Sequence, residues 1–178
     1  VNHIGVIGTG FWGKKHVEEL LNIGVKVTVA DLHQSNFQIY KDRLNCVTDY
    51  LELIKNPDVQ AVIISTPNDT HYKICKDALQ HGKHVLLEKP MTTSHKDATE
   101  LVDLAKKQNL ILSVGHIYRF NNAINKIKNL LDQNYFGDIH IVKITWTNRE
   151  PLWDRDIIFD LAPHPFDFVH YLFGKNPS

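Results

Sequence analysis

A glycine-rich turn between an apolar strand and a helix most constrains the fold of this chain. The apolar residues 4–7 run into the sequence GTGFWG at residues 8–13, and apolar residues then recur at helical spacing. In such a turn Gly8 permits the tight bend, Gly10 lets a diphosphate approach the backbone, and Gly13 lets the helix pack closely on the strand. Free amides and the helix dipole favour an anion there. The turn therefore predicts a dinucleotide-binding unit.

An acidic residue ends the second predicted strand. The run VKVTVA at residues 25–30 is followed directly by Asp31. A carboxylate at this strand end can accept both ribose hydroxyls of an adenosine and would repel a 2′-phosphate. Leu32 and His33 come next, so no arginine follows to hold such a phosphate. We therefore predict NAD in preference to NADP, and the alternative is that Asp31 is an ordinary loop carboxylate.

Composition and charge argue against several classes of protein. The 178 residues are 43% hydrophobic and 22% charged, with a formal net charge of zero. The basic residues are dispersed, so we do not expect nucleic acid as a partner. No apolar run is long enough for a membrane span and no signal peptide precedes the first strand, which predicts a cytoplasmic protein. Cys46 and Cys75 are interpreted as isolated buried thiols.

Strand and helix signals alternate through the first part of the chain. A helical pattern covers about residues 33–43, and Asp49 and Ser94 are placed to cap later helices. Alternation at this spacing implies right-handed crossovers and a parallel sheet. We predict an α/β, doubly wound Rossmann domain over residues 1–117 with strand order 3-2-1-4-5-6. The later strands are expected near residues 46–47, 61–65, 84–87 and 110–114.

The character of the sequence changes beyond this domain. A helix is predicted from about Asn121, and another ends near Phe173 before Gly174. Residues 139–146 alternate apolar and polar side chains, which predicts a strand with one buried face. We interpret residues 118–178 as a truncated α+β substrate domain. A lone strand leaves backbone groups unpaired, so pairing with a second copy of the chain along residues 139–147 is one expectation.

Five motifs in order resemble a known family of enzymes. The motifs are GTGFWG at 8–13, STPNDTH at 65–71, EKP at 88–90, GHIYRFN at 115–121 and DLAPHPFD at 160–167. Together they look like the glucose-fructose oxidoreductase, inositol dehydrogenase and MocA family of NAD(P)-dependent sugar dehydrogenases, and the DLAPH wording is closest to members acting on nucleotide-activated amino sugars. The resemblance implies oxidation of a sugar or nucleotide-sugar hydroxyl by hydride transfer to nicotinamide.

The resemblance also implies catalytic residues. Lys89 matches the lysine of the EKP motif, and Asp160 and His164 match the family's catalytic Asp-x-x-x-His pair. We expect His164 to act as the base, Lys89 to hold the substrate oxygen, and Asp160 to orient His164 or bind a neighbouring hydroxyl. The lysine–proline peptide is often cis in relatives. Pro163 and Pro165 leave open whether Asp160 and His164 share one helix face.

Further positions are candidates for binding the cofactor and the substrate. Arginine suits a phosphorylated or nucleotide sugar, so Arg119, Trp153 and Arg155 are candidate substrate contacts, with surface ion pairing as the alternative. Asp160, His164 and Asp167 lack an evident fourth ligand, so we expect no metal site. At the glycine turn and the second strand, the residues expected to hold the cofactor are Gly8, Gly10, Phe11, Trp12, Gly13 and Asp31. The resemblance implies the others, with Glu88 at the nicotinamide ribose: Thr66, Pro67, Asn68, His71, Glu88 and Lys89.

Two functional classes therefore stay open from the sequence. Relatives are longer, because a large open sheet follows their Asp–His helix, and this chain retains one strand of it at most. The first class is an NAD-dependent sugar dehydrogenase acting on a small molecule, favoured by the presence of Lys89, Asp160 and His164. The second is a non-catalytic dinucleotide-binding module, or an inactive fragment, favoured by the missing sheet. Cofactor binding is expected in both.

Overall fold

A computed structural model of the protein describes residues 2–146 and 157–174. The chain divides into two compact units, Val1–Gly115 and His116–Ser178. This division lies beside the boundary predicted near residue 117. None of the helices described is both long enough and apolar enough to cross a membrane.

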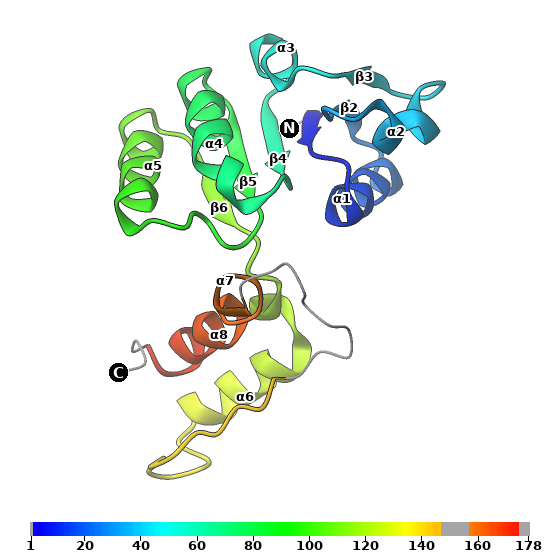
Figure 1. The fold of residues 1–178 in the computed structure, drawn as a ribbon. Helices are drawn as coiled ribbons and strands as arrows, with labels where there is room; N and C mark the ends of the chain where they lie inside the picture. Colours follow the sequence, from blue (N-terminus) through cyan, green and yellow to red (C-terminus); the bar gives the residue numbers. More distant parts are fainter. Residues whose placement is uncertain (1, 147–156, 175–178) are drawn as a thin grey trace. The chain divides into compact units, whose positions relative to one another are not determined.

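The first unit is a parallel sheet with helices on both faces (Figure 1). Its order is β3-β2-β1-β4-β5-β6, which confirms the prediction of a doubly wound Rossmann sheet. Ile7 at the end of β1 lies in register with Ala30 of β2 on one side and Ile64 of β4 on the other. The carboxyl ends of these strands therefore lie level at the point where the strand order reverses. The strands are β1 His3–Ile7, β2 Lys26–Ala30, β3 Asn45–Val47, β4 Ala61–Ile64, β5 His84–Leu87 and β6 Leu112–Val114.

Two helices of this unit, α3 and α5, begin where the sequence places capping residues. The carboxylate of Asp49 accepts a hydrogen bond from the Leu51 amide, and the hydroxyl of Ser94 accepts one from the Asp97 amide. Both predicted caps are confirmed. The helical elements are α1 Phe11–Asn22, α2 Gln34–Phe37, η1 Gln38–Tyr40, α3 Tyr50–Lys55, η2 Asn68–Thr70, α4 His71–Gln80 and α5 His95–Lys107.

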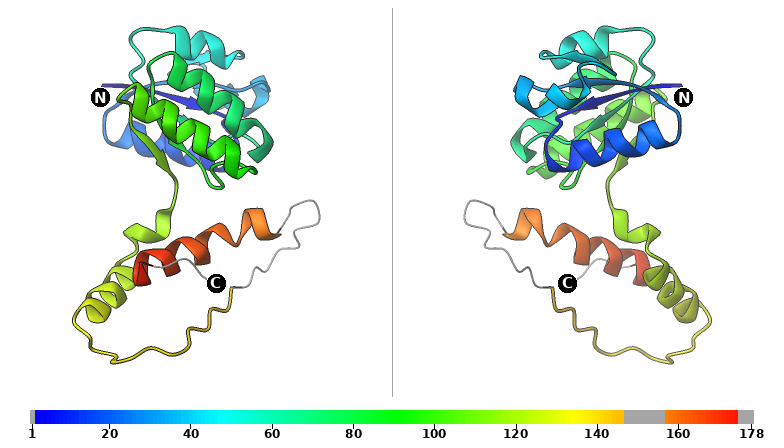
Figure 2. Two further views of the ribbon diagram at one scale, coloured as in Figure 1. Left: turned by 90° about the vertical axis from the view of Figure 1, so that its left-hand side faces the viewer. Right: turned by 90° about the vertical axis from the view of Figure 1, so that its right-hand side faces the viewer.

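Two hydrophobic cores lie on opposite faces of the sheet. On one face Val6 and Ile63 pack with Val17 of α1. On the other face Ile64 packs with Leu79 of α4 and the side chains of α3 and α5. Figure 2 shows α1 on the opposite side of the sheet from α4 and α5. Burial on both faces explains why these strands read as continuous apolar runs rather than as alternating ones.

The helix predicted over residues 33–43 is wrong in its length. The structure has only α2, followed by the 3₁₀ turn η1. The side-chain amide of Asn36 donates to both carboxylate oxygens of Asp31 rather than facing solvent along a helix. The two buried aromatic side chains, Phe37 and Tyr40, are three residues apart, which suits the tighter 3₁₀ spacing.

The regular secondary structure described in the second unit is helical. Asn121 caps α6 by accepting hydrogen bonds from the amides of Ala123 and Ile124. Gly174 ends α8 in the left-handed conformation with φ 66°, as its position after Phe173 predicted. The elements are η3 Ile117–Phe120, α6 Asn122–Asp132, α7 Ile157–Asp160 and α8 Pro163–Phe173.

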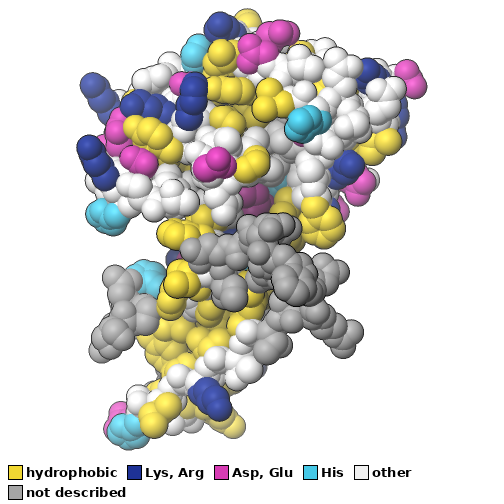
Figure 3. All heavy atoms as spheres, in the orientation of Figure 1, with side chains coloured by type: hydrophobic (Ala, Val, Ile, Leu, Met, Phe, Trp, Pro, Cys, Tyr) yellow, Lys and Arg dark blue, Asp and Glu magenta, His cyan; other side chains and the backbone are white. Residues whose placement is uncertain are grey.

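The strand predicted at residues 139–146 is wrong for this chain. This segment has no regular secondary structure, and its side chains up to residue 145 are exposed. A strand needs a hydrogen-bonded neighbour, and the described residues of this unit supply none. Hydrophobic side chains are prominent on the face of this unit drawn in Figure 3. Pairing of the segment with a second copy stays a prediction.

Candidate functional site

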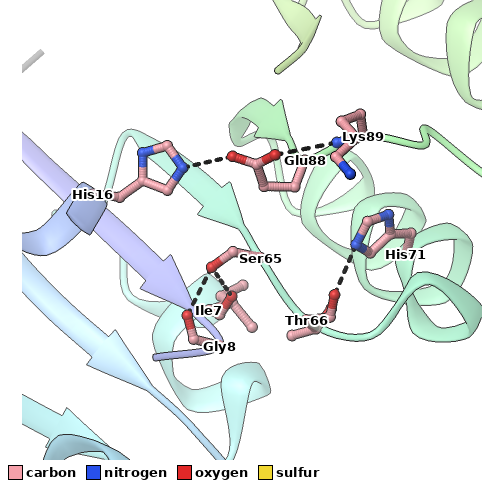
Figure 4. A network of polar contacts seen from close by, with 8 residues as sticks. All are labelled: Ile7, Gly8, His16, Ser65, Thr66, His71, Glu88 and Lys89. Atoms are coloured by element: carbon pink, nitrogen blue, oxygen red, sulfur yellow. Dashed lines mark hydrogen bonds and ion pairs between the residues drawn. The ribbon is translucent and has the colours of Figure 1, made fainter. Parts of the chain in front are cut away.

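The glycine turn after β1 is built by close backbone contacts. Gly8 has a φ of 85°, and a Cβ there would lie 2.8 Å from the carbonyl oxygen of Ser65. The Ser65 hydroxyl donates to the Gly8 carbonyl oxygen at 2.7 Å, a contact drawn in Figure 4. A Cβ on Gly13 would lie 1.9 Å from that same Gly8 oxygen. Only glycine at both positions lets α1 start this close to the strand end.

The start of α1 leaves open space beside its first amides. Gly10 is the N-cap residue, its backbone is extended, and it makes no side-chain capping bond. A Cβ added to Gly10 would meet no heavy atom within 4 Å. The amides of a first helical turn have no partner within the helix. The turn can therefore accept an anionic group such as a diphosphate, which fits the cofactor this fold predicts.

Asp31 lies at the end of β2 beside this turn. Its Oδ2 accepts hydrogen bonds from the amide of Thr9 at 2.7 Å and from the Thr9 hydroxyl at 3.0 Å. Its Oδ1 accepts one from the His33 amide at 2.9 Å. Burial acts to raise the pKa of Asp31, but these bonds and those from Asn36 outweigh it and hold the pKa below its usual value. Asp31 is therefore a fixed anion.

Two aromatic side chains follow the turn at the surface. Phe11 is 71% exposed and Trp12 is 41% exposed, and their rings meet edge to face. The Lys15 ammonium lies 4.3 Å from the centre of the Phe11 ring and 4.6 Å from that of Trp12. The start of α1 thus presents two exposed rings, with the Lys15 ammonium close to both, next to the open turn.

The predicted cofactor residues after β4 form a tight loop. The Thr70 hydroxyl donates to the Pro67 carbonyl and contacts the Thr66 hydroxyl, both at 2.7 Å. His71 is fully buried, and its ring nitrogens contact the carbonyl oxygens of Thr66 at 2.9 Å and Pro90 at 2.8 Å. The His71 side chain thus bridges the loop after β4 and the segment after β5 by contacting a backbone carbonyl of each.

Glu88, Lys89 and Pro90 follow β5 directly. The Lys89–Pro90 peptide bond is cis. The Glu88 carboxylate lies 2.8 Å from Nε2 of His16 on α1, and its other oxygen accepts a hydrogen bond from the Lys89 amide at 3.3 Å (Figure 4). Glu88 and Lys89 therefore lie at the carboxyl ends of the strands, as the glycine turn does.

The predicted catalytic pair of the second unit is not on one continuous helix. Asp160 is the last residue of α7, and His164 lies in the first turn of α8. Helix α8 begins at Pro163, and proline is favoured at the first position of a helix. The His164 ring lies 5.0 Å from the Tyr118 ring, edge to face, and 5.8 Å from the Trp146 ring, stacked. Aromatic side chains therefore fix the plane of the imidazole.

Arg119, a predicted substrate contact, is engaged within its own unit. Its guanidinium donates three hydrogen bonds to Asp167 of α8, the shortest at 2.7 Å, and lies 5.6 Å from the Tyr171 ring. Arg119 is therefore ion-paired, with Asp167, a partner that the sequence did not predict. Trp153 and Arg155, the other two candidates, lie outside the described residues.

The sequence analysis did not identify Thr9 and His16 as parts of this site. Thr9 is fully buried between two glycines, where a hydroxyl needs a partner. His16 lies three residues after Gly13, on a neighbouring part of the helix that packs on the sheet. That helical spacing was the available signal. Among the described residues, no three or more His, Cys, Asp and Glu side chains group as metal ligands, and both cysteines are free.

The strand order, the open glycine turn and the carboxylate at the end of β2 define a Rossmann-type dinucleotide-binding domain. Residues 2–116 match the model of an oxidoreductase family with an NAD-binding Rossmann fold, GFO_IDH_MocA. The chain belongs to this family, which confirms the resemblance stated from its motifs.

Two curated relatives that are inositol dehydrogenases are about twice this length. The myo-inositol 2-dehydrogenase of Thermotoga maritima is 29% identical over 97% of this chain and 55% of its own. The NADP-dependent scyllo-inositol 2-dehydrogenase of Bacillus subtilis is 27% identical over 96% of this chain and 51% of its own. A crystal structure of a probable dehydrogenase from Thermotoga maritima superposes with a TM-score of 0.89 at 28% identity, covering 98% and 56% of the two chains. The chain thus spans about half the length of the curated relatives it matches.

Proposed function

We propose that this chain is the dinucleotide-binding part of an NAD-dependent oxidoreductase that oxidises a hydroxyl of a sugar, a nucleotide sugar or an inositol. The observation that carries the proposal is the pairing of an open glycine turn with Asp31, whose carboxylate is held by Thr9 of that turn. A diphosphate at the start of α1 would place the adenosine ribose toward the end of β2.

The preference for NAD rests on charge at the end of β2. Asp31 is an anion with a lowered pKa, so a 2′-phosphate on the ribose would meet like charge. Leu32 and His33 are exposed beside it and offer no guanidinium. One relative is an NADP-dependent enzyme, so comparing the two cofactors on this chain is the direct test.

The proposed chemistry divides between cofactor and protein. Nicotinamide accepts the hydride, and the protein supplies a base, an electrostatic partner and orientation. We assign His164 as the base for the hydroxyl proton, Lys89 as the cation that holds the substrate oxygen, and Asp160 as the residue that orients His164 or binds a neighbouring hydroxyl. The motifs support these roles, together with the position of Lys89 at the carboxyl end of β5.

Calorimetric titration tests the cofactor part of the proposal. We expect NAD and NADH to bind, and NADP to bind about tenfold or more weakly. Absence of binding by both dinucleotides would contradict the proposal. Adding inositols and UDP-sugars to the NAD complex, while following NADH absorbance, tests the substrate part. Binding of NAD without reduction by any of them would favour a non-catalytic dinucleotide-binding module.

A further inference from the structure

Three elements converge on the carboxylate of Glu88. His16 of α1 holds Oε1 at 2.8 Å, and the backbone amide of Lys89 donates to Oε2 at 3.3 Å. A Cβ on Gly115, the residue after β6, would lie 3.1 Å from Oε2. The Glu88 side chain is only 12% exposed. The carboxylate therefore sits in a space that a larger residue at position 115 would narrow.

Glu88 is an anion in this space. Burial acts to raise the pKa of Glu88, but the hydrogen bond and charge of His16, with the Lys89 amide, outweigh it and place the pKa below its usual value. An ionised carboxylate accepts several hydrogen bonds, so each oxygen keeps capacity for another donor beyond its present partner. A ribose hydroxyl is such a donor.

His16 connects this carboxylate to the helix that begins at the glycine turn. Gly13 and Val17 on either side of it in α1 pack against the sheet and are buried. The His16 side chain is 24% exposed, and its Nε2 faces the end of β5 (Figure 4). An ordinary surface ion pair is the alternative, but such pairs join exposed side chains, and Glu88 is nearly buried.

We propose that His16 is a positioning residue of the cofactor site, which fixes Glu88 so that its carboxylate binds the nicotinamide half of the dinucleotide. This proposal rests on the proposed function. Helix α1 binds the diphosphate and carries His16, whereas Glu88 follows β5. The His16–Glu88 contact thus joins the helix that would bind the diphosphate to the carboxylate that would bind the nicotinamide half. Without it, the longer bond from the Lys89 amide is what holds Glu88 among the residues that the structure describes.

Two ligands separate this role from a general effect on the fold. NADH contains the nicotinamide ribose, and ADP lacks it. We expect His16→Ala to weaken NADH binding about tenfold in calorimetry while the Kd of ADP stays within about twofold. His16→Gln places an amide donor near the position of Nε2 and should recover most of the NADH affinity. His81→Ala, at an exposed histidine after α4, is the control and should change neither Kd.

A double-mutant cycle tests whether His16 acts through Glu88. In a Glu88→Ala background, His16→Ala should cause no further loss of NADH affinity. Equal weakening of NADH and ADP by His16→Ala, unchanged NADH binding, or a full additional loss in the Glu88→Ala background would each overturn the proposal. Wild-type protein that binds neither ligand would overturn the proposed function as well, so the two failures are distinguishable.

Discussion

Thr9 donates two hydrogen bonds to one oxygen of Asp31, from its backbone amide at 2.7 Å and from its hydroxyl at 3.0 Å. One residue of the glycine turn thereby orients the carboxylate at the end of the neighbouring strand. A substitution in the turn should consequently change the position of the Asp31 carboxylate, where the adenosine ribose is expected. We therefore expect Thr9 to be part of the cofactor site, although its side chain is buried.

Replacing Thr9 by valine should weaken cofactor binding while the fold is kept. Valine has nearly the same shape and removes only the hydroxyl bond to Asp31, which is a bond to a charged group worth about 1.5–3 kcal/mol. Part of this should appear as a loss of about three- to tenfold in NADH affinity by calorimetry. Thr99→Val, at an exposed hydroxyl on α5 that bonds to the His95 carbonyl, is the matched control. The same Kd for Thr9→Val and wild type would contradict this assignment.

Asp31 should also contribute to stability in a pH-dependent way. Its pKa is lower in the folded chain than in the unfolded one, so its contribution is present above about pH 4 and is lost as pH falls through the folded-state pKa. We expect Asp31→Asn to unfold at lower urea than wild type at neutral pH, with the gap narrowing below pH 4. A gap that stays constant with pH would show that ionisation of Asp31 is not involved.

His71 should be essential for stability rather than for direct contact with the cofactor. Its buried ring lies between the carbonyl oxygens of Thr66 and Pro90. A neutral imidazole carries one N–H, so His71→Phe would remove one hydrogen bond to these carbonyl oxygens, at a cost of about 1–3 kcal/mol in the free energy of unfolding. Urea denaturation measures it. His81→Ala, at an exposed histidine, should cost less than about 0.5 kcal/mol, and a similar loss in both would contradict the argument.

The two cysteines should differ in reactivity. Burial raises the pKa of Cys75 to about 12, and burial also raises the pKa of the partly exposed Cys46. The thiolate is the reactive form, so a disulfide reagent near neutral pH should modify Cys46 slowly and Cys75 only after unfolding. Cys46→Ser should therefore remove the reaction seen in the native protein. Rapid modification of Cys75 in that variant would show that the α4 core opens readily.

The sheet was predictable because its central strands β1, β2 and β4 are largely buried and the strands are separated by well-marked turns. Gly8, Asp49 and Ser94 each carry a local signal, a positive φ or a helix cap, that needs no long-range information. The helix expected over residues 33–43 was right in position but too regular, because the chain passes from α2 into the 3₁₀ turn η1, which helical periodicity does not distinguish. The prediction of a strand at 139–146 was wrong because alternating side chains indicate a buried face, whereas a strand also needs a hydrogen-bonded neighbouring strand.

The site was predictable in its residue types but less so in its contacts. The motifs placed Glu88 and Lys89 at the end of β5, and the structure agrees with that position. The motifs did not indicate that the His71 ring contacts two backbone carbonyl oxygens, or that Arg119 donates hydrogen bonds to Asp167. Both depend on residues distant in sequence, or on backbone atoms that no sequence pattern displays. Thr9 and His16 were missed for the same reason.

The central claim is that a nicotinamide dinucleotide binds with its diphosphate against the turn at Gly10, and Gly10→Ala tests it most directly. The added methyl group meets no protein atom, so the melting temperature should stay close to that of wild type. It would occupy the space of the diphosphate, so NADH affinity in calorimetry should fall at least about tenfold. Undiminished NADH binding by a folded Gly10→Ala variant would contradict the account.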